Sequence, residues 1–136
     1  MAATYIYWLS TALLALLYFA SATMYIAKGD FVRNAQAELG YSALYLVPLM
    51  VVVKVLGPLA ILWRFNVALS DLAYAGIFYH LILAGMAHLG VRKPTDAVPA
   101  AVGLVLLIAS FVTQNAVRQL PSPYAPFVTV FQASLI

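Results

Sequence analysis

Residues 44–63 have the sequence LYLVPLMVVVKVLGPLAILW, a nearly continuous apolar run with a single cation, Lys54, close to its midpoint. At a rise of about 1.5 Å per residue, roughly 20 helical residues cross the hydrocarbon core of a bilayer, which is about 30 Å thick. A lysine at the centre of such a helix costs about 2.5–3.5 kcal/mol on insertion scales. We therefore expect a membrane-spanning helix whose Lys54 faces the interior of a helix bundle.

The same helix is predicted to bend next to this lysine. Gly57 and Pro58 follow Lys54 by three and four residues. Because proline has no N–H, the carbonyl of Lys54 loses its partner within the helix, and a kink is expected. Gly57 shares the helix face that carries Lys54, so we assign both residues to a candidate ligand-binding site.

The composition extends the membrane interpretation to the whole chain. Of its 136 residues, 65% are hydrophobic and only 8% are charged, and the mean hydropathy is +0.99. Soluble domains contain about 25% charged residues, so the sequence favours an integral membrane protein. The net charge of +3 comes from scattered cations, which do not form the basic patch that nucleic-acid binding requires. The chain has no cysteine, which excludes disulfides and thiolate chemistry.

Three further apolar runs predict spans at residues 6–26, 70–89 and 98–115. We therefore expect an all-α membrane protein, an antiparallel bundle of four membrane-spanning helices, with residues 1–120 as a single transmembrane domain. A secretory signal peptide is the alternative for the first run, because residues 20–22 (Ala-Ser-Ala) resemble a cleavage site. No basic residue precedes this run, and it is long for a signal peptide, so we favour a retained helix.

The polar connectors and the tail complete this plan. Residues 28–41 (KGDFVRNAQAELGY) predict a short interfacial helix between the first two spans, with Phe31, Ala35 and Leu39 on its apolar face. Ser70 and Asp71 are expected to cap the third span. Residues 121–136 are too short, and too rich in proline at their start, to form a span. We expect this apolar tail to lie at the membrane surface or to contact a neighbouring subunit.

His80 is the second candidate residue of the ligand-binding site. It lies near the middle of the third span, and in an antiparallel hairpin it should reach the same depth as Lys54. The positions on either side of it on that helix face carry small residues, which predicts close helix packing: Ala73, Gly76, Ala84 and Ala87.

Tyr18 is the third candidate. It belongs to a polar face of the first span on which four residues recur every seven positions: Thr4, Thr11, Tyr18 and Tyr25. Tyr18 lines a ligand pocket in one interpretation. In the other, the stripe marks the side that faces neighbouring helices, where hydroxyl groups find partners.

Two interpretations of Lys54 and His80 also stay open. They form a proton relay or a polar handle for a buried ligand, or they are satisfied by backbone carbonyls and hydroxyls and serve packing alone. A metal site is not expected, because two histidines eight residues apart, without a thiolate, fall short of the usual ligand number.

The chain contains, in this order, the segments YWLSTALLALLYFASATMYI, ELGY, KVLGPLAIL and DLAYAGIFYHLILAGMAHL. On these segments, over about residues 5–115, it resembles the DoxX-like family of small four-helix bacterial membrane proteins. The resemblance implies a bundle in the bacterial inner membrane and an association with redox systems such as quinone-linked or thiol-oxidant-defence oxidoreductases. In the broader group the second helix carries an acid near the position of Lys54, so a mechanism built on that acid is not transferred to this chain.

Three functions from different classes follow as hypotheses. The first is an accessory subunit of a membrane oxidoreductase that holds a quinone, with Lys54 bonding a quinone carbonyl. The second is a binding protein or carrier for a small lipophilic molecule. The third is a stand-alone membrane enzyme that uses Lys54 and His80 in acid–base catalysis. The expected partners are the lipid bilayer, oxidoreductase subunits and a second copy of the chain.

Overall fold

The computed structural model describes residues 2–40 and 45–126. Five α-helices lie in these ranges: α1 (Ala2–Ala27), α2 (Gly29–Glu38), α3 (Leu46–Trp63), α4 (Val67–Gly90) and α5 (Val98–Thr113). The 3₁₀ turns η1 (Pro94–Ala97) and η2 (Gln114–Ala116) flank α5, and these ranges contain no strand. Four segments are long and apolar enough to cross a membrane: α1, α3, α4 and Pro94–Ala116, which includes α5.

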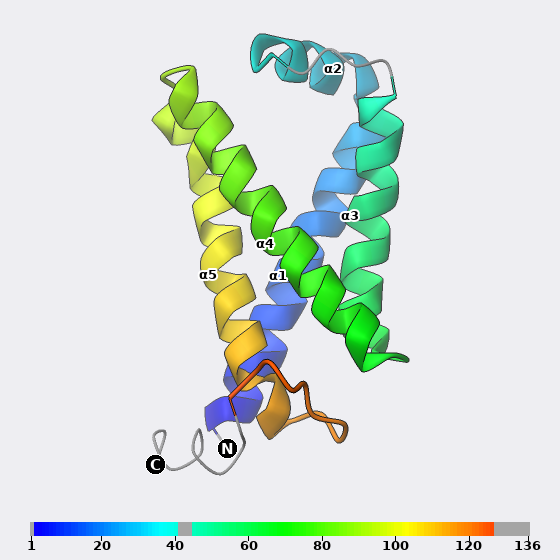
Figure 1. Ribbon diagram of the computed structural model, residues 1–136. Helices are drawn as coiled ribbons and strands as arrows, with labels where there is room; N and C mark the ends of the chain where they lie inside the picture. Colours follow the sequence, from blue (N-terminus) through cyan, green and yellow to red (C-terminus); the bar gives the residue numbers. More distant parts are fainter. Residues whose placement is uncertain (1, 41–44, 127–136) are drawn as a thin grey trace.

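The four long helices form a bundle in which successive helices run in opposite directions (Figure 1). α1 packs against α3 and α5, and α4 packs against the same two helices, so α1 and α4 lie on one diagonal of the bundle. The short helix α2 lies across the end where α1 finishes and α3 begins (Figure 1). The predicted fold class, an all-α membrane bundle with a short helix between the first two spans, is confirmed.

Buried apolar side chains from all four long helices meet in the centre of the bundle. The largest members of this core are Leu14, Tyr18, Ile61, Tyr74, Ile77, Leu81 and Leu107. Within it, Ser110 Oγ lies 2.6 Å from Thr11 Oγ1 and 2.7 Å from Tyr74 Oη. These hydrogen bonds join α1, α4 and α5, and lipid offers such hydroxyls no competing partners.

The outside of the bundle carries many large apolar side chains. Leucines on three different helices are more than half exposed: Leu16 at 63%, Leu56 at 58% and Leu72 at 67%. Large exposed apolar surfaces on a soluble protein would promote aggregation, whereas on a membrane protein they contact lipid chains. This distribution, together with the four apolar helices, identifies an integral membrane protein.

The predicted start of the third span was wrong. α4 begins at Val67, three residues before the expected cap, and Asn66 caps it by accepting a hydrogen bond from the Leu69 N–H at 3.0 Å. Asparagine is as good a cap as serine, and the apolar residues between them continue the helix. The face that packs into the bundle carries Ser70, Tyr74, Ile77 and Leu81. The small-residue stripe lies beside this face, and two of its members, Ala73 and Ala84, are partly buried against the core.

The buried face of α2 is displaced by one residue from the apolar face that the sequence predicted. Val32 is the buried residue of this helix, whereas Phe31 is 64% exposed. Successive residues of a helix are about 100° apart around its axis, so a displacement by one residue exchanges these two side chains. The face directed towards the bundle therefore includes Gln36, which lies one turn beyond Val32.

The opposite end of the bundle is closed by the chain that follows α5. Arg64 donates to Gln114 Oε1 at 2.6 Å and to the Leu120 carbonyl at 2.7 Å. Beyond this point Ser122 and Ala125 are buried against the bundle. Residues 121–126 are thus the described part of the expected tail. Residues 127–136 lie outside the described residues, so the location of the tail at the membrane surface or in a subunit contact stays a prediction.

Candidate functional site

Tyr18 and His80, which the sequence places 62 residues apart, meet across the diagonal of the bundle. The Tyr18 hydroxyl oxygen lies 2.7 Å from His80 Nδ1, and the two rings meet edge to face with centroids 5.7 Å apart. A neutral imidazole offers one donor and one acceptor nitrogen, so this bond fixes which nitrogen carries the proton once the direction of the bond is set. If Tyr18 donates, Nε2 of His80 is left with an N–H to offer.

Lys54 points into the bundle and is only 5% exposed. Its Nζ lies 5.1 Å from the centroid of the Tyr18 ring and 4.8 Å from that of the Tyr25 ring. Both distances are within the roughly 6 Å over which an ammonium is attracted to an aromatic face. Among the described residues no carboxylate forms an ion pair with Lys54. The aromatic faces of Tyr18 and Tyr25 therefore provide the electrostatic environment of this cation.

Pro58 lies inside α3, as predicted, and the helix continues beyond it to Trp63. Gly57 is directed towards α4 and not towards the ammonium. A Cβ atom at this position would lie 3.3 Å from Ile77 Cδ1, which indicates close packing of α3 on α4. The structure thus gives Gly57 a packing contact, and its assignment to a ligand-binding site stays a prediction.

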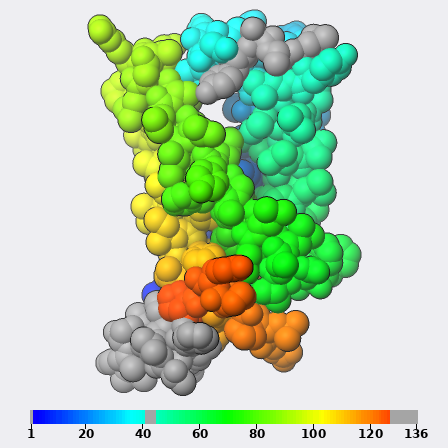
Figure 2. All heavy atoms as spheres, viewed as in Figure 1, coloured from blue at the N-terminus to red at the C-terminus, as the bar shows by residue number. Residues whose placement is uncertain are grey.

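A pocket of about 260 Å³ opens next to this cluster, below α2. Figure 2 shows an opening at this end of the molecule, between α4 and α3. Its polar lining consists of Tyr25, Gln36, His80 and His88, and its apolar lining consists of Leu39, Leu46, Met50, Leu83, Ala84 and Ala87. His80 belongs to both the pocket wall and the Tyr18 hydrogen bond, so it connects the cavity to the buried cluster.

His88 adds an unsatisfied polar atom to this wall. Its Nδ1 is buried and has no hydrogen-bond partner among the described residues. Buried polar atoms in folded proteins nearly always have a partner, so an unpaired nitrogen in a cavity wall is where a ligand or water would bond. Gln36 faces the same pocket, and its side-chain amide contacts the Tyr25 hydroxyl at 3.4 Å.

The structure therefore brings together three of the four predicted residues, Lys54, His80 and Tyr18, and adds three that the sequence analysis had not assigned. Tyr25 had been placed on the polar face of the first span, and its seven-residue spacing from Tyr18 indicated the same helix face. His88, near the end of the third span, had not been singled out as a site residue. Gln36 carried no signal, because its position depends on how α2 lies across the bundle.

A second, larger pocket lies elsewhere and contains none of these residues. It has a volume of about 600 Å³ and is lined by the first half of α4, by α5 and by Tyr124. The two cavities thus occupy opposite halves of α4. Among the described residues, no group of three or more histidine, aspartate or glutamate side chains is placed to hold a metal ion.

A bundle of apolar helices with a buried cation–aromatic–imidazole cluster defines a multi-pass α-helical membrane protein. The family model of the DoxX-like family matches residues 9–112, a range that extends from α1 to α5, and the chain belongs to this family. No curated protein and no solved structure matches the chain significantly.

Proposed function

We propose that this protein binds a small lipophilic molecule with a polar head group in the pocket below α2, and that the ligand class is a quinone. The observation that carries the proposal is the combination of a largely apolar cavity with polar groups at its inner wall. Such cavities, with a few convergent polar groups, are the usual form of small-molecule sites. The volume of about 260 Å³ suits a head group of one or two rings whose tail extends into the bilayer.

The chain's own residues fit a quinone head group. Among the described residues the buried His88 Nδ1 has no hydrogen-bond partner, and no acceptor bonds the Lys54 ammonium. His80, oriented by Tyr18, would offer its second ring nitrogen to one carbonyl oxygen. Lys54 does not line the pocket itself but lies 4.8 Å from the centroid of the Tyr25 ring, which does, and would donate to a head group that reaches past this ring. A bound quinone would supply two-electron redox chemistry that no side chain of this cysteine-free chain can supply.

We place this binding function in an accessory subunit of a membrane oxidoreductase, in the inner membrane of a bacterium. Its support is the membership in the DoxX-like family and the cation held at mid-bundle beside the pocket. The alternative is a carrier for a lipophilic molecule without a redox partner, which the mainly apolar lining of both cavities favours. Affinity purification from native membranes distinguishes the two, because only the accessory subunit should bring a redox-active protein with it.

The Lys54→Met variant tests the proposed site. Methionine keeps much of the shape of lysine and removes the charge, so the variant should unfold at the same temperature as the wild type or higher. Mass spectrometry of molecules extracted from the gently solubilised protein should detect a quinone in the wild type and at least tenfold less in Lys54→Met. Lys28→Met removes an exposed charge at the end of α1 and should retain the ligand. Equal ligand content in all three proteins would show that Lys54 does not bind the ligand and serves packing alone.

A further inference from the structure

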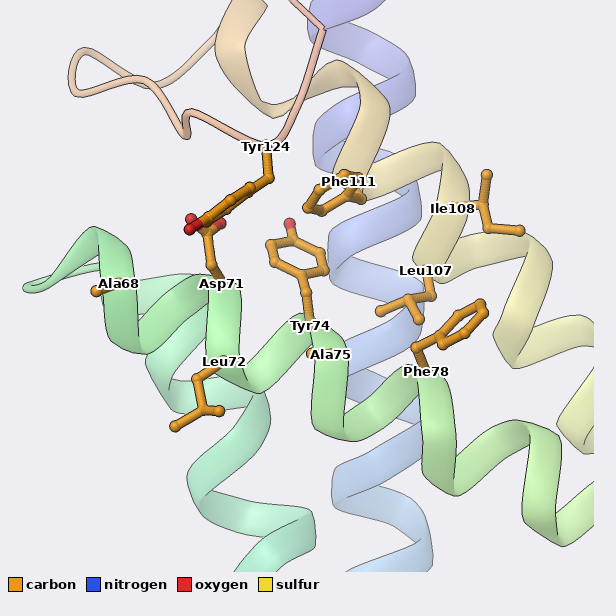
Figure 3. A pocket seen from close by; sticks show the side chains of 10 residues that line it. All are labelled: Ala68, Asp71, Leu72, Tyr74, Ala75, Phe78, Leu107, Ile108, Phe111 and Tyr124. Atoms are coloured by element: carbon orange, nitrogen blue, oxygen red, sulfur yellow. The ribbon is translucent and has the colours of Figure 1, made fainter.

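The larger cavity has the form of a binding site for an amphiphile. About 600 Å³ in volume, it lies between α4 and α5 and is closed at one end by the segment that carries Tyr124 (Figure 3). Phe78, Leu107, Ile108 and Phe111 contribute apolar walls. Figure 3 shows the carboxylate of Asp71 and the ring of Tyr124 towards one end of the cavity, and Phe78 and Ile108 towards the other. The cavity therefore has one charged end and one apolar end.

Among the described residues, one carboxylate oxygen of Asp71, at the charged end, has no hydrogen-bond partner. Its Oδ2 accepts a hydrogen bond from the Ser122 hydroxyl at 2.9 Å, so one of the two carboxylate oxygens has a partner. Its Oδ1 is buried, and among the described residues it has no hydrogen-bond donor. The Tyr74 hydroxyl, another member of the cavity wall, is already bound to Ser110 at 2.7 Å. Oδ1 therefore lacks a donor among the described residues, and the hydroxyls of the cavity wall belong to Tyr74, which is bonded to Ser110, and to Tyr124.

No side chain of the described residues supplies a counter-charge to Asp71. The ion pairs among the described residues are Asp30 with Arg33 and Glu38 with Lys93, and both lie at the α2 end of the bundle, away from Asp71. Two arginines lie at the same end of the bundle as Asp71, but they donate to other groups. Arg64 donates to the Gln114 side chain and the Leu120 carbonyl. Arg118 donates to the Tyr7 hydroxyl and to the carbonyls of Ile61 and Leu62. No lysine, arginine or histidine occurs outside the described ranges. An unpaired carboxylate in an apolar cavity is costly, and it marks a site where a cationic partner belongs.

We infer that this cavity binds an amphiphile with a primary ammonium head, whose N–H groups bond Asp71 Oδ1 and whose apolar chain lies along Phe78, Leu107 and Ile108. An ammonium has three donors and no acceptor, which matches a site whose one charged group is a carboxylate and whose Tyr124 hydroxyl can also accept. A hydrogen bond between an ammonium and a carboxylate is about twice as strong as a neutral one. Two sources share this chemistry: an aminophospholipid of the bilayer and a free lipophilic amine.

Native mass spectrometry of the purified protein in a maltoside detergent tests the inference with two probes of equal chain length. Dodecylamine carries the ammonium, and dodecanol lacks it. The wild type should retain dodecylamine at least tenfold more strongly than dodecanol. Asp71→Asn, which keeps the shape of the side chain, should abolish this difference. Asp96→Asn is the matched control, because it neutralises an exposed acid in η1 and should leave the preference unchanged.

A second variant fills the cavity and leaves the carboxylate in place. Ala75 lines the cavity and is exposed, so Ala75→Trp should fold and should weaken retention of dodecylamine at least tenfold. The same measurement in nanodiscs identifies the source of the ligand. Preferential retention of phosphatidylethanolamine over phosphatidylcholine would identify a lipid head group, and retention of dodecylamine without such a preference would identify a free amine.

Equal retention of dodecylamine and dodecanol by the wild type would overturn the inference. So would a folded Asp71→Asn variant that keeps the preference. If Asp71→Asn does not fold, Ala75→Trp decides, because unchanged retention in that variant would show that the amine binds elsewhere. Loss of quinone from the first pocket has no bearing on these outcomes, since the two cavities have no lining residue in common.

Discussion

Lys54 is held in the bundle by two tyrosine rings, and Tyr18 contributes in two ways. Its ring lies under the ammonium, and its hydroxyl bonds His80 Nδ1. The two interactions use different atoms of one side chain, so they can be removed separately. A cation–aromatic contact is worth about 0.5–2 kcal/mol depending on its desolvation, and a neutral hydrogen bond about 0.5–1.5 kcal/mol.

Tyr18→Phe should lower the free energy of unfolding by about 1 kcal/mol, because it removes the hydroxyl and leaves a buried His80 nitrogen unpaired. Tyr18→Leu should cost more, since it removes the aromatic face as well. Thermal unfolding in detergent measures both, and Tyr79→Phe, an exposed tyrosine on α4, is the control. A Tyr18→Phe protein as stable as the wild type would show that the Tyr18–His80 bond contributes nothing to folding.

At the scale of elements, α2 is the one helix outside the bundle core, and it forms one wall of the candidate quinone pocket. An ion pair joins it to the connector after α4: Lys93 Nζ lies 3.0 Å from Glu38 Oε2. The hydrogen bond to Glu38 and the negative charge of that residue raise the pKa of Lys93 above its ordinary value. Both side chains are exposed, so salt will screen this attraction.

Lys93→Gln should loosen α2 from the connector that precedes α5. The chain has no cysteine, so spin labels at Asn34→Cys and Thr95→Cys report the distance between these two elements specifically. We expect the distance distribution to broaden in Lys93→Gln and to remain narrow in Arg33→Gln, which removes an ion pair within α2 alone.

The pH dependence of this contact has a defined sign. Because the pKa of Lys93 is raised in the folded protein, the ammonium contributes fully below the unfolded-state pKa, and its contribution is lost as the pH rises through the folded-state value. The wild-type distribution should therefore stay narrow up to about pH 10, the ordinary range of a lysine, and should broaden towards that of Lys93→Gln as the pH rises above it. A wild-type distribution independent of pH would argue against the ion pair as the tether.

At the scale of the whole molecule, the chain after α5 returns to close the bundle end. Asn115 holds this segment with both ends of its side-chain amide. The two N–H groups of Nδ2 are shared among the carbonyls of Ser122, Ala125 and Pro126, at 2.9, 3.3 and 3.1 Å, and Oδ1 accepts the Ser122 N–H at 2.7 Å. The segment in turn carries Tyr124, the end wall of the larger cavity. One buried amide thus positions a wall of a candidate ligand site.

Asn115→Ala should destabilise the protein by about 1–3 kcal/mol, because it leaves buried backbone groups without partners. It should also expose residues 117–126 to protease. The control is Gln119→Ala, an exposed residue of the same segment. Thermal unfolding and limited proteolysis in detergent check both expectations, and an Asn115→Ala protein as resistant as the control would show that other contacts hold the segment.

The sequence by itself determined the number of spans, the position of the short helix and the inward direction of Lys54. Each of these follows from local quantities: the length of an apolar run, the cost of a charge in hydrocarbon and the periodicity of a helix. The depth match of Lys54 and His80 also followed, because an antiparallel hairpin fixes the depth of each residue along the bundle axis. These properties need no knowledge of how the helices turn about their axes.

Only the tertiary structure decided which side chains meet. Rotation of α4 by a fraction of a turn placed Tyr74, Ile77 and Leu81 in the core and left the small-residue stripe beside it. The position of α2 brought Gln36 into one pocket, and the return of the chain after α5 brought Ser122 to Asp71. Helix rotation and chain return are set by the sum of many weak packing contacts over the whole bundle, and no local pattern encodes that sum.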